Sequence, residues 1–236
     1  MGIVMGFLTD RLGPRLVMTI SCFLLGMGYL LMSQVSSIWQ LYLFYGVIVG
    51  TGMGGAWVPL LSTVARWFAK RRGMMTGIVL TGTGIGTLVL SPAASWLISV
   101  YNWRVSYLIL GSLVLVVGIL AAQFLKRDPA RMGQVPYGEK EVREPGIEVY
   151  ASGYSLGEAV RTRQFWVFLA MELFFGLFVF SVMVHIVPHA IDLGISSTSA
   201  AAILAASGAL NISGRVILGG TGDRIGNKQV FLICFA

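Results

Sequence analysis

The chain has 236 residues, of which 56% are hydrophobic and only 11% are charged. A soluble globular domain carries about a quarter charged residues, so this composition excludes an ordinary soluble protein. It predicts an all-α, polytopic membrane helix bundle. The formal net charge of +7 would suit a nucleic-acid partner, but the distribution of the basic residues along the chain excludes one.

Six complete apolar spans follow one another along the chain. No Asp, Glu, Lys or Arg occurs between residues 16 and 65, and these 50 residues are enough for two membrane spans. Only about eight apolar residues precede the first charged motif, and eight follow Lys228, so we expect a truncated chain with a partial span at each end. The complete spans are expected at roughly 16–33, 39–65, 74–98, 105–125, 164–188 and 198–219.

The third of these spans is rich in glycine. It carries Gly77, Gly82, Gly84 and Gly86, followed by Pro92. Such a run predicts either a packing face of small residues with a proline kink or a functional hinge.

A charged segment, residues 126–163, separates two groups of spans. It holds seven basic and six acidic residues together with three of the seven prolines. Because it cannot bury a core of its own, we expect a solvated linker between an N-terminal half, residues 1–125, and the start of a C-terminal half, residues 164–236. Near its end, the run from Ser155 to Glu158 predicts a capping box that opens a short helix.

The basic residues are strongly clustered, with 15 of the 17 Lys and Arg in four loops. These loops are residues 9–15, 66–73, 126–163 and 220–228. The loops that alternate with them, near residues 34–38, 99–104 and 189–197, hold only Arg104. Because basic residues are enriched in loops that stay inside the cell, we expect the four basic loops to be cytoplasmic in a multi-pass protein of the plasma or inner membrane.

A ten-residue pattern, G-x-x-x-D-R-x-G-x-[R/K], occurs twice, each time joining two apolar stretches. Its residues are Gly6, Asp10, Arg11, Gly13 and Arg15 in the first copy, and Gly219, Asp223, Arg224, Gly226 and Lys228 in the second. The pattern resembles the loop signature of the major facilitator superfamily of secondary transporters, where it follows the second and the eighth membrane helix. The resemblance implies an incomplete major facilitator fold, with two related halves and with helices three to eight complete.

Each motif aspartate ends its helix on the basic side. Asp10 and Asp223 can pair with the arginine that follows, or with the N-terminus of a neighbouring helix, where a negative charge is favoured. The resemblance implies that this pairing latches the cytoplasmic side shut while the transporter is open outward. The alternative is that the motif charges only anchor helix ends and set the topology.

Four further stretches resemble the monocarboxylate and oxalate/formate antiporter branch of the superfamily. Their order and spacing cover most of the chain, and the resemblance implies a small organic anion as substrate. Protons would then be the coupling partner in a symporter, or a counter-anion in an antiporter. The stretches run from Trp67 to Ile78, from Asn102 to Arg104, from Asp128 to Gly138 and from His185 to Ser196.

Two ionised side chains, Glu172 and Arg215, lie well inside apolar spans. Arg215 lies eight residues before Asp223, and Glu172 lies nine residues after Arg163. At the helical rise, each is therefore roughly 12 to 13 Å from the basic side, near the centre of a hydrocarbon layer about 30 Å thick. Charged residues at such a depth are costly in lipid and point to function.

The resemblance implies a role for Arg215, because an arginine four residues before the motif binds the substrate carboxylate in this branch. Its planar guanidinium suits a carboxylate; the alternative is that it extends to the headgroups. Animal monocarboxylate carriers have an aspartate one turn earlier, where this chain has Asn211, which can bind substrate but cannot take up a proton. Glu172 could instead pair with Arg215 and couple protons to the anion. If Glu172 faces lipid, an anion exchanger is expected.

The leading hypothesis is a secondary active transporter that moves a monocarboxylate, oxalate or formate type of anion by alternating access. The alternatives are a superfamily transporter of another substrate class, or a membrane sensor with the same fold and no flux. The sequence shows no nucleophile–base arrangement, metal cluster or P-loop. We therefore expect no enzyme activity, no cofactor and no metal site, and we expect a monomer.

Overall fold

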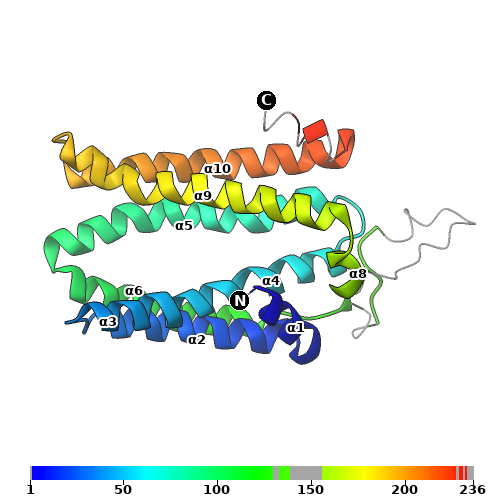
Figure 1. The fold of residues 1–236 in the computed structure, drawn as a ribbon, viewed down its shortest axis with the longest axis horizontal. Coiled ribbons are helices and arrows are strands. Elements are labelled where there is room, and N and C mark those ends of the chain that lie inside the picture. Colours follow the sequence, from blue (N-terminus) through cyan, green and yellow to red (C-terminus); the bar gives the residue numbers. More distant parts are fainter. Residues whose placement is uncertain (1, 130–132, 139–155, 227–228, 231, 233–236) are drawn as a thin grey trace, which may run out of the picture.

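The computed structural model of the chain describes residues 2–129, 133–138, 156–226, 229–230 and 232. The regular elements of this part are helices, and it contains no β-strand beyond an isolated bridge between Phe68 and Tyr137. The long helices lie side by side along the longest dimension of the molecule (Figure 1). This arrangement confirms the predicted all-α helix bundle.

We use the term N-terminal half for the elements before the charged segment, α1 to α6, and C-terminal half for the elements after it. In chain order the elements of the N-terminal half are α1 (Gly2–Leu12), α2 (Pro14–Met32), α3 (Ile38–Leu41), the π-helix η1 (Tyr42–Val49), α4 (Gly50–Trp67), α5 (Arg72–Val100) and α6 (Trp103–Gln123). The elements α3, η1 and α4 follow one another without a break and form one span. The described part of the C-terminal half contains α8 (Leu156–Val160), α9 (Arg163–Asp192) and α10 (Ser197–Ile225).

Within the described residues, six helices are long and apolar enough to cross a membrane. Each overlaps one of the spans expected from hydropathy, so those six spans are confirmed. The pattern is readable because a spanning helix must present apolar side chains over about 20 residues. The six helices are Pro14–Met32, Ile38–Trp67, Arg72–Val100, Trp103–Gln123, Arg163–Asp192 and Ser197–Ile225.

The two motif copies are more helical than the expected loops 9–15 and 220–228. Helices α1 and α10 each continue to the residue before the second glycine of their motif. The chain turns at Gly13 (φ 89°) and Gly226 (φ 90°), in a backbone region that favours glycine. Pro14 then begins α2, a position where its fixed φ and missing N–H are well tolerated. The second glycine of each copy is therefore a helix terminator.

Polar residues begin three of the long helices. Asn102, Thr162 and Ser196 each accept a hydrogen bond from the backbone N–H three residues later, at 2.9, 3.3 and 3.3 Å respectively. These bonds satisfy N–H groups that have no partner inside the helix. The predicted capping box at Ser155 lies outside the described residues.

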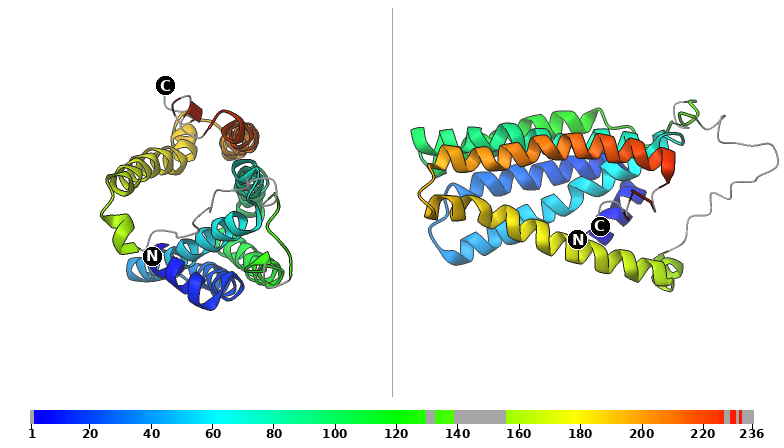
Figure 2. Two further views of the ribbon diagram at one scale, coloured as in Figure 1. Left: turned by 90° about the vertical axis from the view of Figure 1, so that its right-hand side faces the viewer. Right: turned by 90° about the horizontal axis from the view of Figure 1, so that it is seen from above.

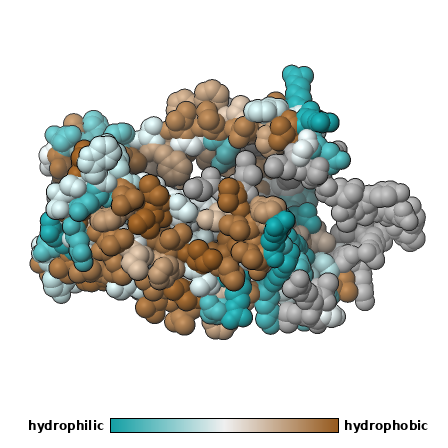
Figure 3. Space-filling model, turned by 60° about the horizontal axis from the view of Figure 1, so that its bottom comes forward, coloured by the Kyte–Doolittle hydropathy of each residue, from teal (hydrophilic) through white to brown (hydrophobic). Residues whose placement is uncertain are grey.

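The bundle has one end at which the basic loops gather. There α1 ends and α2 begins, α4 ends and α5 begins, α9 begins and α10 ends (right-hand side of Figure 1). We call this the basic end, and the left view of Figure 2 looks at it directly. In the space-filling view, apolar side chains cover the middle of the molecule and polar ones gather toward its two ends (Figure 3). This banding is the surface that a bilayer-spanning protein requires.

Small residues bring the helices of the N-terminal half close together. A Cβ added to Gly26 on α2 would lie 2.6 Å from the Cβ of Leu115 on α6, and one added to Gly55 on α4 would lie 2.1 Å from the hydroxyl of Ser21. Close backbone approach of this kind is typical of helix packing in lipid. Helix α9 differs, since none of the residues in its most apolar window is buried. In the described residues, α9 contacts its neighbours sparsely and leaves most of its apolar side chains exposed.

Candidate functional site

The second motif copy joins the two halves at the basic end. The Asp223 carboxylate on α10 accepts hydrogen bonds from the backbone N–H groups of Gly73, at 2.9 Å, and Met74, at 2.8 Å. Both donors belong to the first turn of α5, where N–H groups lack partners in the helix and a negative charge is favoured. Arg71 precedes them in a left-handed conformation (φ 57°, ψ 35°) and turns the chain into α5. Of the two partners that the sequence left open for Asp223, the structure shows the helix N-terminus.

Helices α5 and α10 approach each other through glycines along much of their length. A Cβ added to Gly77 would lie 2.4 Å from the backbone oxygen of Arg215, and one added to Gly208 would lie 2.7 Å from that of Gly84. At Gly219, the first glycine of the motif, an added Cβ would lie 2.7 Å from the backbone oxygen of Gly73. Part of the glycine run on α5 is therefore a packing face. We call this contact the α5–α10 seam.

The first motif copy is held by side chains rather than by a helix end. The Asp10 carboxylate forms an ion pair with Arg66, the last basic residue of α4, at 2.8 Å. Arg66 also reaches Asp128, at 3.2 Å, so it bridges two carboxylates. Arg127 donates to the backbone oxygen of Asp10. The neighbouring Arg11 is not the partner of Asp10; its guanidinium lies 4.4 Å from the ring centroid of Phe7.

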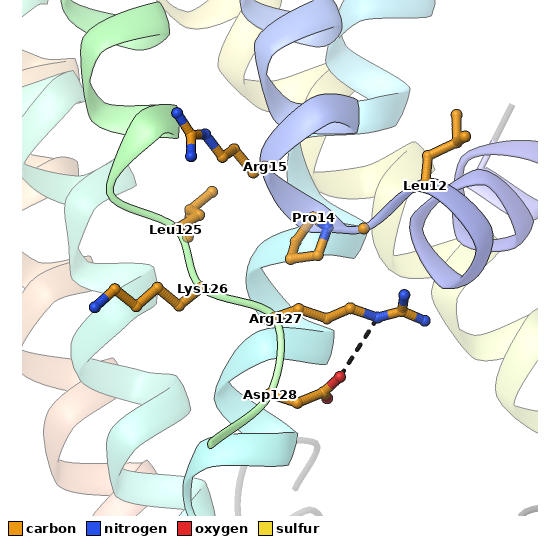
Figure 4. Close-up of a pocket in the computed structure, with 8 residues that line it drawn as sticks. Leu12, Pro14, Arg15, Leu125, Lys126, Arg127 and Asp128 are labelled. Carbon is orange, nitrogen blue, oxygen red and sulfur yellow. Dashed lines mark ion pairs between the residues drawn. The ribbon is translucent and has the colours of Figure 1, made fainter. Parts of the chain in front are cut away.

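A cavity of about 350 Å³ lies beside the first motif, between its turn and the segment after α6. Arg15 donates from Nε and Nη2 to the side-chain oxygen of Gln123, at 2.9 and 2.6 Å. Arg127 Nε is buried without a hydrogen bond and lies 3.5 Å from the carboxylate of Asp128. Figure 4 shows Arg15 and Lys126 extending to one side and Arg127 to the other. The basic side chains therefore point away from one another. Their contacts hold the motif in place, and they do not converge on a single anion.

Arg215 lies on the α5–α10 seam. Its Nη1 donates to the backbone oxygen of Leu80 on α5 at 2.9 Å, and its side chain is half-buried. The hydroxyl of Thr83 donates to the same oxygen at 2.8 Å. A guanidinium has five N–H donors, and this is the one hydrogen bond of the Arg215 side chain within the described residues. Asn211, one turn away on α10, is exposed.

The comparisons with known proteins agree with this arrangement of helices and motifs. The family model for the Major Facilitator Superfamily matches residues 1–236. The chain belongs to the major facilitator superfamily.

Several curated relatives of this superfamily member carry transporter names. Monocarboxylate transporter 12 of Mus musculus is 30% identical over 228 residues, covering 88% of this chain and 46% of that protein. Monocarboxylate transporter 11 of Homo sapiens is 28% identical over 222 residues, covering 92% and 44%. The uncharacterized MFS-type transporter YhjX of Escherichia coli (strain K12) is 28% identical over 233 residues, covering 98% and 55%. The chain thus spans about half the length of these relatives.

Several broad properties of the protein follow from its membership of the major facilitator superfamily. Its six apolar helices and its transporter relatives identify a multi-pass membrane protein with an incomplete major facilitator helix bundle. Proteins of this family are transporters and not enzymes. Within the described residues, no three His, Cys, Asp or Glu side chains lie close enough together to hold a metal ion.

The structure does not bring Glu172 and Arg215 together. Glu172 is exposed on α9, and it forms no ion pair with any other described residue of this superfamily member. Arg215 extends toward α5 instead, because the glycine seam places the backbone oxygen of Leu80 within its reach. Pairing was expected only if both residues face the bundle interior, and in this conformation the two charges are not in contact.

Several site residues had no role assigned from the sequence. Arg66 and Asp128 complete the ion-pair cluster with Asp10, and each lies in a basic loop or a charged stretch that the sequence did mark. The acceptor Leu80 carries no side-chain signal, since it takes part through its backbone oxygen. Lys228, the last residue of the second motif, lies outside the described residues.

Proposed function

We propose that the complete protein is a secondary active transporter that moves a small organic anion across the membrane by alternating access. The observation that carries the proposal is the position of Arg215. It is a guanidinium near the middle of a membrane span, half-buried, at the contact between the two halves, with one donor used by Leu80. A charge in such a place is costly unless it has a function.

The geometry around Arg215 suits a carboxylate of the monocarboxylate, oxalate or formate type. A guanidinium can present two parallel N–H groups to the two oxygens of a carboxylate, and one donor is engaged by Leu80. Asn211 is exposed one turn away on the same helix and can add an amide hydrogen bond. The names of the monocarboxylate transporters 11 and 12 support this class of substrate.

The two motif copies would act as the gate at the basic end. Asp223 holds the start of α5, and the cluster of Asp10, Arg66 and Asp128 ties α1, α4 and the segment after α6 together. An opening at this end that separates α5 from α10 must break the Asp223 hydrogen bonds. We therefore interpret this conformation as closed at the basic end, and we assign that end to the cytoplasmic side of the plasma or inner membrane from the charge bias.

Coupling would depend on Glu172, the other ionisable side chain at this depth. If Glu172 approaches Arg215 in another conformation, its protonation would release the guanidinium for substrate and give proton–anion symport. If Glu172, which is exposed here, never approaches Arg215, the protein exchanges one anion for another. We propose that a monomer carries out either cycle, since Arg215 and the contacts of both motif copies lie within one chain.

The experiment that tests the function uses the full-length protein reconstituted in liposomes. Arg215→Lys keeps the charge and loses the paired donors, so uptake of radiolabelled oxalate, formate or lactate should fall at least about tenfold, the effect of losing roughly 1.4 kcal/mol of binding. Arg104→Lys, at the opposite end of the bundle, is the matched control and should transport normally. Uptake by Arg215→Ala at the wild-type rate would remove this residue from the site.

A further inference from the structure

A second basic cavity lies at the basic end, where the seam of α5 and α10 opens beside the Asp223 contact. Its volume is about 700 Å³. Four basic side chains line it, against one carboxylate, that of Asp223. Lys70 and Arg71 come from the turn before α5, Arg72 is the first residue of α5, and Arg224 comes from the last turn of α10.

Among the described residues, the arginines of this cavity have few neutralising partners. Within the described residues, neither the Arg71 nor the Arg224 side chain has a hydrogen bond or an ion pair. The Nε–H of Arg72 donates to the backbone oxygen of Phe68 at 3.1 Å, so its two Nη groups remain available to bind a ligand. Asp223 does not compensate them, since both of its oxygens accept backbone N–H groups of α5. Guanidinium groups arranged in this way suit the oxygens of a phosphate.

The other wall of the cavity is apolar. Val216 and Ile217 line it about two helical turns before Arg224, and 64% of the Ile217 surface is exposed. Because α5 and α10 are both long enough to span a membrane, this wall lies at the depth of acyl chains and the basic rim lies at the depth of headgroups. A soluble phosphate would use only the rim, whereas a phospholipid would use both parts.

We propose that this cavity binds the phosphate headgroup of an anionic phospholipid. The headgroup lies among Arg71, Arg72 and Arg224, and one acyl chain runs along Val216 and Ile217. Basic pockets between membrane helices favour anionic headgroups by about 1 kcal/mol for each Lys or Arg near the surface. Since the arginines come from both α5 and α10, a bound headgroup links the two halves next to the Asp223 contact. The proposal does not depend on the transported substrate.

The test measures lipid binding to the purified chain in a neutral detergent. Native mass spectrometry gives the affinity for the first bound phosphatidylglycerol and for phosphatidylcholine with the same acyl chains. We expect phosphatidylglycerol to bind more tightly. The variant Arg71→Gln/Arg224→Gln should weaken its binding about thirtyfold, the fold-change that two basic side chains at about 1 kcal/mol each provide. Each single variant should weaken it about fivefold.

The control and the competing ligand separate the outcomes. Arg161→Gln removes an exposed basic residue of the same end that does not line the cavity, and it should leave the affinity unchanged. Circular dichroism should show equal helix content in all variants. Unchanged phosphatidylglycerol binding in the double variant, or an equal loss in Arg161→Gln, would overturn the site. If millimolar inorganic phosphate displaces the lipid and phosphatidylcholine binds equally well, the lipid assignment is wrong and the ligand is a soluble phosphate.

Discussion

The substitution Gly77→Ala should force the α5–α10 seam apart. The added Cβ would lie 2.4 Å from the backbone oxygen of Arg215 and 3.2 Å from its carbonyl carbon. Backbone atoms in a helix cannot move aside as the end of a side chain can. To reach ordinary van der Waals contact at about 3.5 Å, the two helices must separate by about 1 Å.

The cost of this separation can be isolated with a second glycine of the same helix. Overpacking costs about 1–3 kcal/mol, while replacing a helical glycine by alanine gains up to about 1 kcal/mol in helix propensity. At Gly82 an added Cβ has no neighbour within 4 Å. Gly82→Ala should therefore show only the gain, and the two variants should differ in free energy of unfolding by about 1–3 kcal/mol.

The same separation should be visible at the Asp223 contact, which lies one turn from Gly77. Its hydrogen bonds to Gly73 and Met74 are 2.9 and 2.8 Å long, and lengthening them by about 1 Å would break them. These two N–H groups have no acceptor inside α5, so their protection from hydrogen exchange depends on Asp223. In Gly77→Ala we expect their exchange to accelerate about five- to hundredfold.

The assay is hydrogen exchange by mass spectrometry, with the thermal midpoint of each variant measured in the same detergent. Asp223→Ala removes the acceptor of both amides, so its exchange rates define complete loss of protection. Equal midpoints for Gly77→Ala and Gly82→Ala, with exchange of the two amides unchanged in both, would refute the close approach of α5 and α10 and its link to the gate.

Three further predictions concern the charges of the chain. Arg66→Ala should cost at most about 1 kcal/mol of stability, because its pair with the largely exposed Asp10 is screened by solvent. In the full-length protein the same substitution should shift the conformational balance toward opening at the basic end. Spin-label distances across that end that match the wild type would contradict this. An impermeant thiol reagent outside intact cells should label a cysteine at Asn102 and spare one at Gln134, and the reverse pattern would invert the proposed topology. Glu172→Gln should abolish stimulation of uptake by an imposed pH gradient if the protein is a symporter, whereas retained stimulation would remove Glu172 from coupling.

The spans and several helix ends could be predicted from the sequence because the signals are local. A run of about 20 apolar residues has few structural solutions in lipid, and a glycine with positive φ ends α1 and α10 where the motif places it. The π-helix η1 had no such signal. Its residues Tyr42–Val49 are uniformly apolar, and their pattern does not distinguish a π-helix from an α-helix.

The partners of the motif residues could not be predicted because they depend on tertiary placement. The two copies have the same pattern, yet Asp223 binds a helix N-terminus and Asp10 binds Arg66. The difference is the position of the nearest helix start relative to each aspartate. Likewise Arg215 extends to a backbone oxygen of α5, and every residue of that helix carries such an oxygen. Depth along the helix was predictable, but the direction of the side chain was not.

The α5–α10 seam also sets how this protein can change over evolutionary time. A glycine that faces a backbone atom across the seam cannot be replaced without cost. Even the methyl group of alanine would lie within 3 Å of that backbone atom. Other glycines of the same two helices have open space and are free to drift to alanine or serine. Lineages should therefore keep the first set and exchange the second, although both look alike in a single sequence. The first set is Gly73, Gly77, Gly84, Gly208 and Gly219, and the second is Gly82, Gly86 and Gly214.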